Sequence, residues 1–102
     1  MGKVIYHPAA RAELRDAAAY YEANRYGLGR KFLAAVDEAV AHICGHPQMG
    51  AVIHSPYRRF LVRKFPYGII YRETGDTIYI VAVMHLRRKP AYWMSRVNPE
   101  QV

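Results

Sequence analysis

The first half of the chain carries its apolar side chains at helical spacing. Lys3–Tyr6 has the composition of a short strand, and Pro8 suits the first turn of a helix because its missing N–H leaves no bond unmade. A stripe at every third or fourth position then predicts a helix over residues 9–24: Ala10, Leu14, Ala17 and Tyr21. Gly27 suits a left-handed helix cap. A second stripe predicts a helix over residues 28–43: Phe32, Val36, Ala39, Val40 and Ile43.

The second half has the pattern of strands and tight turns. Three strands are expected, at residues 58–65, 67–73 and 78–86. Pro66 presets a tight turn between the first two, and Gly75–Asp76 is a two-residue hairpin signal between the second and third. The last strand is apolar on both faces, which predicts an interior position. An N-terminal strand, an α-helical hairpin and a three-stranded antiparallel sheet make an α+β fold, and the length fits a single domain over residues 1–102.

The two turns also predict a register for the sheet. They place Arg72 opposite Tyr79 and Ile70 opposite Val81, while Arg63 faces Ile70 and Leu61 faces Arg72 in the other hairpin. Alternation then gives one face as the bed for the helices: Phe60, Val62, Ile69, Tyr71, Ile80, Ala82, Met84 and Leu86. The opposite face collects polar groups with apolar residues between them: Arg63, Arg72, Tyr79, His85 and Arg87, with Leu61, Ile70, Val81 and Val83. This basic face is the predicted binding surface.

Charge strengthens that prediction because it is concentrated in the second half. The chain has a net charge of +7, and residues 52–102 hold nine Lys or Arg against three Asp or Glu. Five of these cations lie within residues 57–72, without an acid among them: Arg58, Arg59, Arg63, Lys64 and Arg72. Folding gains nothing from such self-repulsion, so the charge indicates an acidic or polyanionic partner.

Composition also excludes several classes of protein. The single cysteine, Cys44, cannot form an intrachain disulfide and fits a reducing compartment. The longest apolar run, Ile78–Met84, is far short of the roughly 20 residues that cross a bilayer. No charged and apolar leader opens the sequence, so a cytoplasmic location without membrane association is expected.

Two stretches carry a family resemblance. The run from Arg59 to Arg72, RFLVRKFPYGIIYR, and the ending His85-x-Arg87-Arg88-x-Pro90-x-Tyr92-Trp93 resemble the RelE/ParE superfamily of toxins from bacterial type II toxin–antitoxin modules. Tyr20-Tyr21, Gly27-Leu28-Gly29 and His46-Pro47 support it. The ending is closer to the ParE branch.

The resemblance implies a plasmid-stabilisation toxin that inhibits DNA gyrase by binding, without catalysis or a cofactor. It also implies a hetero-oligomeric complex with a ParD-like, ribbon-helix-helix antitoxin, through which alone the protein would meet promoter DNA. The residues expected to bind the target or the antitoxin are Arg58, Arg59, Arg63, Arg72, Arg87, Arg88, Lys89, Tyr92 and Trp93. For the last two, packing over an otherwise open core is an equal alternative.

Two alternatives stay open, one from the RelE branch and one without a target of its own. A ribosome-dependent mRNA interferase needs a base or acid and cations for the phosphate, and His85, Arg63 and Arg72 supply those residue types. A degenerate toxin would only bind its antitoxin. No metal is expected, because His42 and His46 are two imidazoles without a third ligand nearby in sequence.

Overall fold

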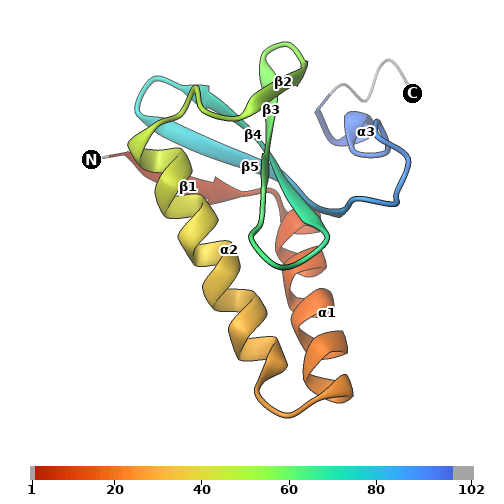
Figure 1. Cartoon of the computed structure of the whole chain (residues 1–102). Coiled ribbons are helices and arrows are strands. Elements are labelled where there is room, and N and C mark those ends of the chain that lie inside the picture. The colour runs from red at the N-terminus through yellow and green to blue at the C-terminus, as the bar shows by residue number, and fades with distance from the viewer. Residues whose placement is uncertain (1, 98–102) are drawn as a thin grey trace.

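A computed structural model describes residues 2–97 of the chain (Figure 1). Its elements follow one another as β1 (Lys3–Tyr6), α1 (Pro8–Asn24), α2 (Leu28–Gly45), β2 (Ala51–His54), β3 (Tyr57–Leu61), β4 (Tyr67–Thr74), β5 (Thr77–His85) and α3 (Met94–Val97). The predicted α+β class, the N-terminal strand and the pair of helices are confirmed. Within the described residues, no helix combines the length and apolarity needed to cross a bilayer.

The helical hairpin is fixed by local capping and by a close approach of its two helices. The Ala9 N–H donates to His7 Nδ1 over 3.0 Å at the start of α1. Gly27 has the predicted left-handed conformation, with φ of 83°. At Gly29 a Cβ would lie 2.5 Å from the Ala18 carbonyl oxygen, so only glycine lets α2 come this near α1.

The sheet is larger than predicted. It has five strands in the order β1-β5-β4-β3-β2, with β1 parallel to β5 and the other neighbours antiparallel. The prediction of three antiparallel strands is therefore incomplete at both edges. Strand β2 was not predicted because it is four residues long and its sequence, AVIH, has no alternation of apolar and polar residues. Strand β5 is interior, as predicted.

The register of the β4–β5 hairpin follows the prediction only near its turn. Arg72 pairs with Tyr79 as expected, but Ile70 pairs with Ala82 instead of Val81 because the register shifts between Ile70 and Tyr71. Such a bulge adds one residue and moves the following side chains to the other face.

The bulge overturns part of the predicted face assignment. Ala82 and Met84 belong to the cluster on the face away from the helices, and Val83 packs with the helices. Val83 and His85 both line a hollow with Glu13 of α1, so His85 also lies on the helix side. The prediction that His85 shares a face with Arg72 is wrong.

The β3–β4 connection is also longer than predicted. Strand β3 ends at Leu61, which pairs with Gly68, so residues 62–66 form a loop instead of continuing the strand. The predicted pairs of Arg63 with Ile70 and of Leu61 with Arg72 are therefore wrong. Phe65 causes the early end, since its ring sits 5.0 Å from Tyr21 and 5.2 Å from Phe32, centroid to centroid, and anchors the loop on the helices.

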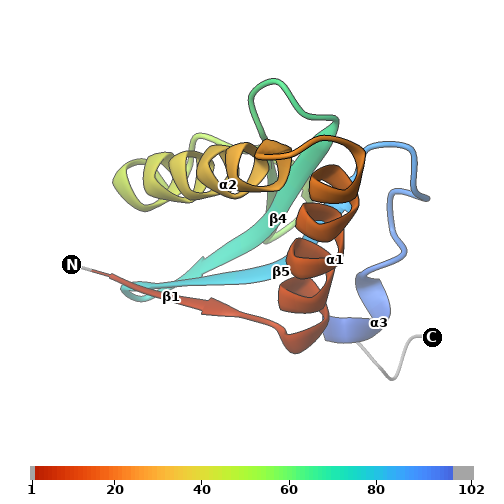
Figure 2. The ribbon, with the colours of Figure 1, turned by 90° about the horizontal axis from the view of Figure 1, so that it is seen from below.

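Apolar clusters cover both faces of the sheet. The larger one lies under α1 and α2 and includes Phe32, Ile69 and Tyr71. The smaller one lies on the other face, under the chain that follows β5, and is centred on Trp93. Figure 2 shows α1 and α2 over the strands, with α3 on the side of α1 away from α2.

Candidate functional site

The predicted binding residues fall into three separate places. Arg58, Arg59 and Arg72 lie on β3 and β4, and Arg63 lies in the β3–β4 loop. The rest belong to the chain after β5, residues 86–97, which we call the C-terminal segment: Arg87, Arg88, Lys89, Tyr92 and Trp93. The single basic face expected from the sequence is therefore divided among these places.

Trp93 anchors the C-terminal segment to the sheet. Its side chain is 1% exposed, its ring centroid lies 5.2 Å from that of Tyr57, and its indole N–H donates to the Pro90 carbonyl over 2.8 Å. Ile70 and Met84 belong to the same buried cluster. In the described structure Trp93 therefore covers the core, which was the alternative interpretation of this residue.

Glu13 ties the same segment to α1. Its Oε2 lies 2.8 Å from Arg96 Nη2 and its Oε1 lies 3.0 Å from Arg96 Nη1, a bidentate ion pair. The Tyr92 hydroxyl donates to Oε2 over 2.6 Å, and Arg88 Nη1 lies 3.3 Å from the same oxygen. We call Glu13, Arg88, Tyr92 and Arg96 the Glu13 clasp.

The clasp also satisfies the open edge of β5. Strand β1 ends at Tyr6, opposite Ile80, so it pairs with no residue of β5 beyond that point. There the Val83 N–H donates to Glu13 Oε1 over 3.0 Å, and Arg96 Nη1 donates to the Val81 carbonyl over 2.9 Å. Helix, sheet and C-terminal segment thus meet at one carboxylate.

The protonation of the clasp favours the paired, charged state. Burial by itself raises the pKa of Glu13, but hydrogen bonds from Arg96, Tyr92 and the Val83 N–H outweigh it and hold that pKa below its ordinary value. Burial and the bond to Glu13 raise the pKa of Tyr92, so its hydroxyl remains a donor. The bond to Glu13 likewise raises the pKa of Arg96.

The clasp leaves the basic triplet of the segment at the surface. Arg87, Arg88 and Lys89 are all exposed. The Arg88 guanidinium lies 3.8 Å from the centroid of the Tyr92 ring and its side chain is 52% exposed, so it is held from one side and open on the other. The arrangement presents three neighbouring positive charges on a fixed base.

Arg58 and Arg72 donate hydrogen bonds within the described part of the protein, whereas Arg59 Nε is buried there without a partner. Arg58 Nη1 donates to the carbonyls of Gln48 and Gly50 over 3.0 and 2.8 Å, which holds the chain before β2. Arg72 Nε donates to Thr74 Oγ1 over 3.1 Å. Arg59 lines a cavity of about 230 Å³ beside Trp93.

The groups of the ribonuclease alternative are not brought together. Arg63 lines a groove beside α2, whereas Arg72 lines a groove with Tyr79 where β1, β4 and β5 meet α3. His85 packs against Tyr67 on the helix side, with ring centroids 5.1 Å apart. The three side chains face different regions, so they form no common phosphate site in this structure.

Sequence reasoning missed Glu13 and Arg96. A signal for Glu13 is present, because it stands between Ala10 and Ala17 at a spacing that shares their helix face, and both alanines are buried. A carboxylate at such a position requires a partner. Among residues 2–97, no cluster of three or more His, Cys, Asp or Glu is placed to hold a metal ion.

Comparisons with known proteins place this architecture among toxins. Residues 4–90 match the model of a family described as the ParE toxin of type II toxin-antitoxin system, parDE. The chain is 31% identical over 85 residues to Toxin ParE2 of Mycobacterium tuberculosis strains CDC 1551 / Oshkosh and ATCC 25618 / H37Rv, covering 82% of this chain and 81% of each relative. A solved structure, described as a chromosomal ParDE TA system from P. aeruginosa, has a TM-score of 0.61 and 18% identity, covering 85% of this chain and 98% of its own. That likeness shows the fold alone.

Proposed function

Because the chain belongs to the ParE toxin family of type II toxin–antitoxin systems, we propose that it inhibits DNA gyrase by binding and is neutralised by a cognate, ParD-like antitoxin. The observation that carries the proposal is the exposed triplet Arg87–Lys89 on the Glu13 clasp. Basic side chains on a fixed backbone suit an acidic or polyanionic surface.

The clasp supports binding because it orders the segment in advance. A mobile basic tail loses conformational entropy when it binds, about 0.5–1.5 kcal/mol for each long side chain that becomes fixed. Here Trp93 holds the chain just before α3, Arg96 holds α3 itself, and Arg88 is stacked on Tyr92. The segment therefore meets its target with part of that entropy already lost.

Inhibition by binding also agrees with the absence of a shared phosphate site for Arg63, Arg72 and His85. General acid–base cleavage requires its groups within hydrogen-bond reach of the same reacting atoms. The structure therefore favours an interface over a ribonuclease centre.

A separate groove suits the antitoxin. It has a volume of about 550 Å³ and lies where β1, β4 and β5 meet α3. Its lining is mostly apolar or aromatic, including Ile5, Tyr57 and Tyr79, with Arg72 as its cation. An amphipathic segment with apolar anchors and a carboxylate for Arg72 fits that lining, and such a segment folds as it binds.

The variant Arg87→Gln/Lys89→Gln tests the role of the triplet. Neither side chain makes a bond within the described part of the chain, so the fold should be unaffected. Losing about 1.4 kcal/mol of binding raises the concentration for half-inhibition of gyrase supercoiling about tenfold.

Lys3→Gln/Arg15→Gln is the matched control, because it removes the same charge from exposed positions on β1 and α1. It should inhibit gyrase like the wild type. Equal inhibition by the wild type and the triplet variant would show that the C-terminal segment is not part of the gyrase interface.

A further inference from the structure

A second basic surface lies away from the C-terminal segment, between α2 and the β3–β4 loop. It is a groove of about 570 Å³, which we call the helix groove. Four cations line it, two from the hairpin side and two from the loop: Arg25, Lys31, Arg63 and Lys64. Glu38 is the carboxylate among the lining residues. The helical half, nearly neutral as a sequence, thus contributes to a strongly positive surface.

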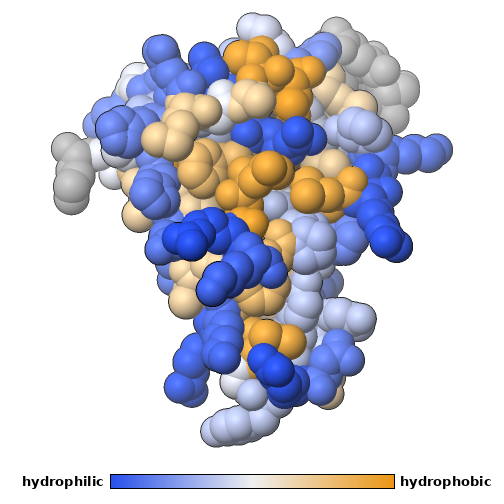
Figure 3. Space-filling view, viewed as in Figure 1, coloured by the Kyte–Doolittle hydropathy of each residue, from blue (hydrophilic) through white to orange (hydrophobic). Residues whose placement is uncertain are grey.

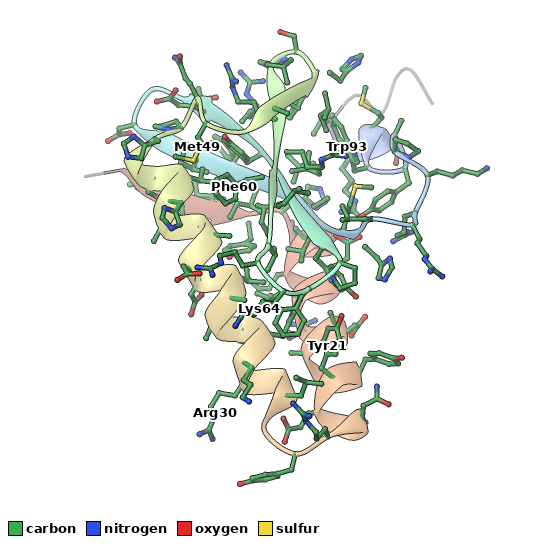
Figure 4. The ribbon with its side chains drawn as sticks, in the orientation of Figure 1. Tyr21, Arg30, Met49, Phe60, Lys64 and Trp93 are labelled. Atoms are coloured by element: carbon green, nitrogen blue, oxygen red, sulfur yellow. The ribbon has the colours of Figure 1, made fainter. Side chains whose placement is uncertain are left out.

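These four cations are exposed and available to a ligand. Among residues 2–97, the ion pairs are those of Glu13 with Arg88 and Arg96, so none of the four is paired. Figure 4 shows Lys64, which comes from the β3–β4 loop, lying over α2, the helix that carries Arg30. In the space-filling view, hydrophilic side chains gather over α2 and the neighbouring loop (Figure 3).

The backbone holds the cations together although they repel one another. Phe65 anchors the loop between the helices, and the Val62 N–H donates to the Tyr67 carbonyl over 2.9 Å. Lys64 has φ of 68°, a left-handed conformation that costs a non-glycine residue roughly 1 kcal/mol. Repulsion and backbone strain at one place both lower stability, so neither is explained by folding.

We propose that the helix groove binds the phosphate backbone of duplex DNA. Lys and Arg side chains on two elements match a phosphate row, which needs positive charge at an open surface and no deep pocket. Four cations and one carboxylate line the helix groove, whereas the groove at β1, β4, β5 and α3 has Arg72 as its one arginine, so charge favours phosphates here over the apolar anchors of a peptide.

The aromatic content favours a duplex over a single strand. Single-stranded nucleic acid needs open ring faces on which its bases stack. The aromatic residue of the helix groove is Phe65, and its ring is packed edge-on against Tyr21 and Phe32. The helix groove can therefore contact phosphates, but it has no open ring face on which a base could stack. This proposal does not depend on gyrase being the target.

The test measures fluorescence anisotropy of a labelled 20-base-pair duplex with the full chain at several salt concentrations. Lys31→Gln/Lys64→Gln removes one cation from each side of the helix groove. Two lost phosphate contacts should raise Kd on the order of tenfold at 0.1 M salt and make the slope of log K against log salt shallower by about 1.8.

Lys3→Gln/Arg15→Gln controls for net charge and should change Kd and slope much less. Equal weakening by the two pairs would mean binding by overall charge and would overturn the proposal. Arg25→Gln/Arg63→Gln gives a second, independent pair, and thermal melting should show each variant folded at or above the wild-type midpoint because repulsion is reduced.

Two further binding measurements test other ligands for the helix groove. A labelled single strand bound more tightly than the duplex would overturn the choice of duplex DNA. A poly-glutamate peptide whose affinity falls with Lys31→Gln/Lys64→Gln, while duplex affinity does not, would assign the groove to an acidic peptide instead.

Discussion

Replacing Glu13 with glutamine should release the C-terminal segment from the rest of the fold. The substitution keeps the length and shape of the side chain but removes its charge and one of its two acceptor oxygens. The NH₂ group of the new amide, itself a donor, would then face other hydrogen-bond donors, among them Arg96 and the Tyr92 hydroxyl. Both oxygens of Glu13 accept at least two bonds each in the native protein, so no orientation of the amide restores them.

The size of the effect follows from the burial of the pair. The side chains of Arg96 and Glu13 are 15% and 16% exposed, so Arg96 would remain charged with little access to water. Removing one partner of a buried ion pair costs about 3–5 kcal/mol. Because this pair retains some access to solvent, we expect the lower end, about 3 kcal/mol.

Trp93 makes the release directly measurable. It is the single tryptophan of the chain, so its fluorescence reports the C-terminal segment while circular dichroism at 222 nm reports the helices. In Glu13→Gln the Trp93 transition should move to lower urea and precede the helical transition. If the domain unfolds as one unit with an m-value of about 1.5 kcal/mol per M, the same loss lowers the common midpoint by about 2 M urea. Asp16→Asn is the control, with the same charge change on an exposed position of α1.

If Glu13→Gln leaves Trp93 buried and unfolds with the wild-type midpoint, Glu13 does not hold the C-terminal segment on the fold. A fall of both signals together would instead show that the segment and the helices form one cooperative unit. In that case the size of the loss would still test the magnitude assigned to the ion pair.

Further substitutions and pH test other contacts. Gly29→Ala should destabilise the protein by about 1–3 kcal/mol, since the new Cβ meets the Ala18 carbonyl at 2.5 Å; Gly45→Ala, with nothing within 4 Å, should be neutral or stabilising in the same thermal melt. Tyr92→Phe keeps the ring but loses the bond to a charged carboxylate, and chemical denaturation should show a loss of about 1.5–3 kcal/mol. The folded-state pKa of Glu13 is depressed, so its stabilisation is present above the ordinary value of 4.5 and lost as pH falls through the lower, folded value; the gap between wild type and Glu13→Gln should close in that range.

Local patterns were sufficient for the elements whose signals are local. The helix stripes and Gly27 gave both helices, and Gly75–Asp76 gave the turn and the Arg72–Tyr79 pair. The register failed further along the strands because a bulge near Ile70 has no marker such as glycine or proline in the sequence.

Contacts between distant residues explain what the sequence could not predict about the candidate site. Phe65 ends β3 early because it packs on two helices that lie far before it in the chain. The Glu13 clasp joins positions 83 residues apart, and no periodicity reports such a meeting. The basic triplet Arg87–Lys89 could be predicted from the sequence, but the contact of the Glu13 carboxylate with the C-terminal segment could not.

We propose that this ParE-family chain inhibits gyrase by contact. The most direct measurement uses purified, antitoxin-free protein in paired reactions, one with gyrase and supercoiling substrate and one with mRNA on translating ribosomes. We expect loss of supercoiling, accumulation of linearised DNA and intact mRNA. Cleaved mRNA with normal gyrase activity would contradict it.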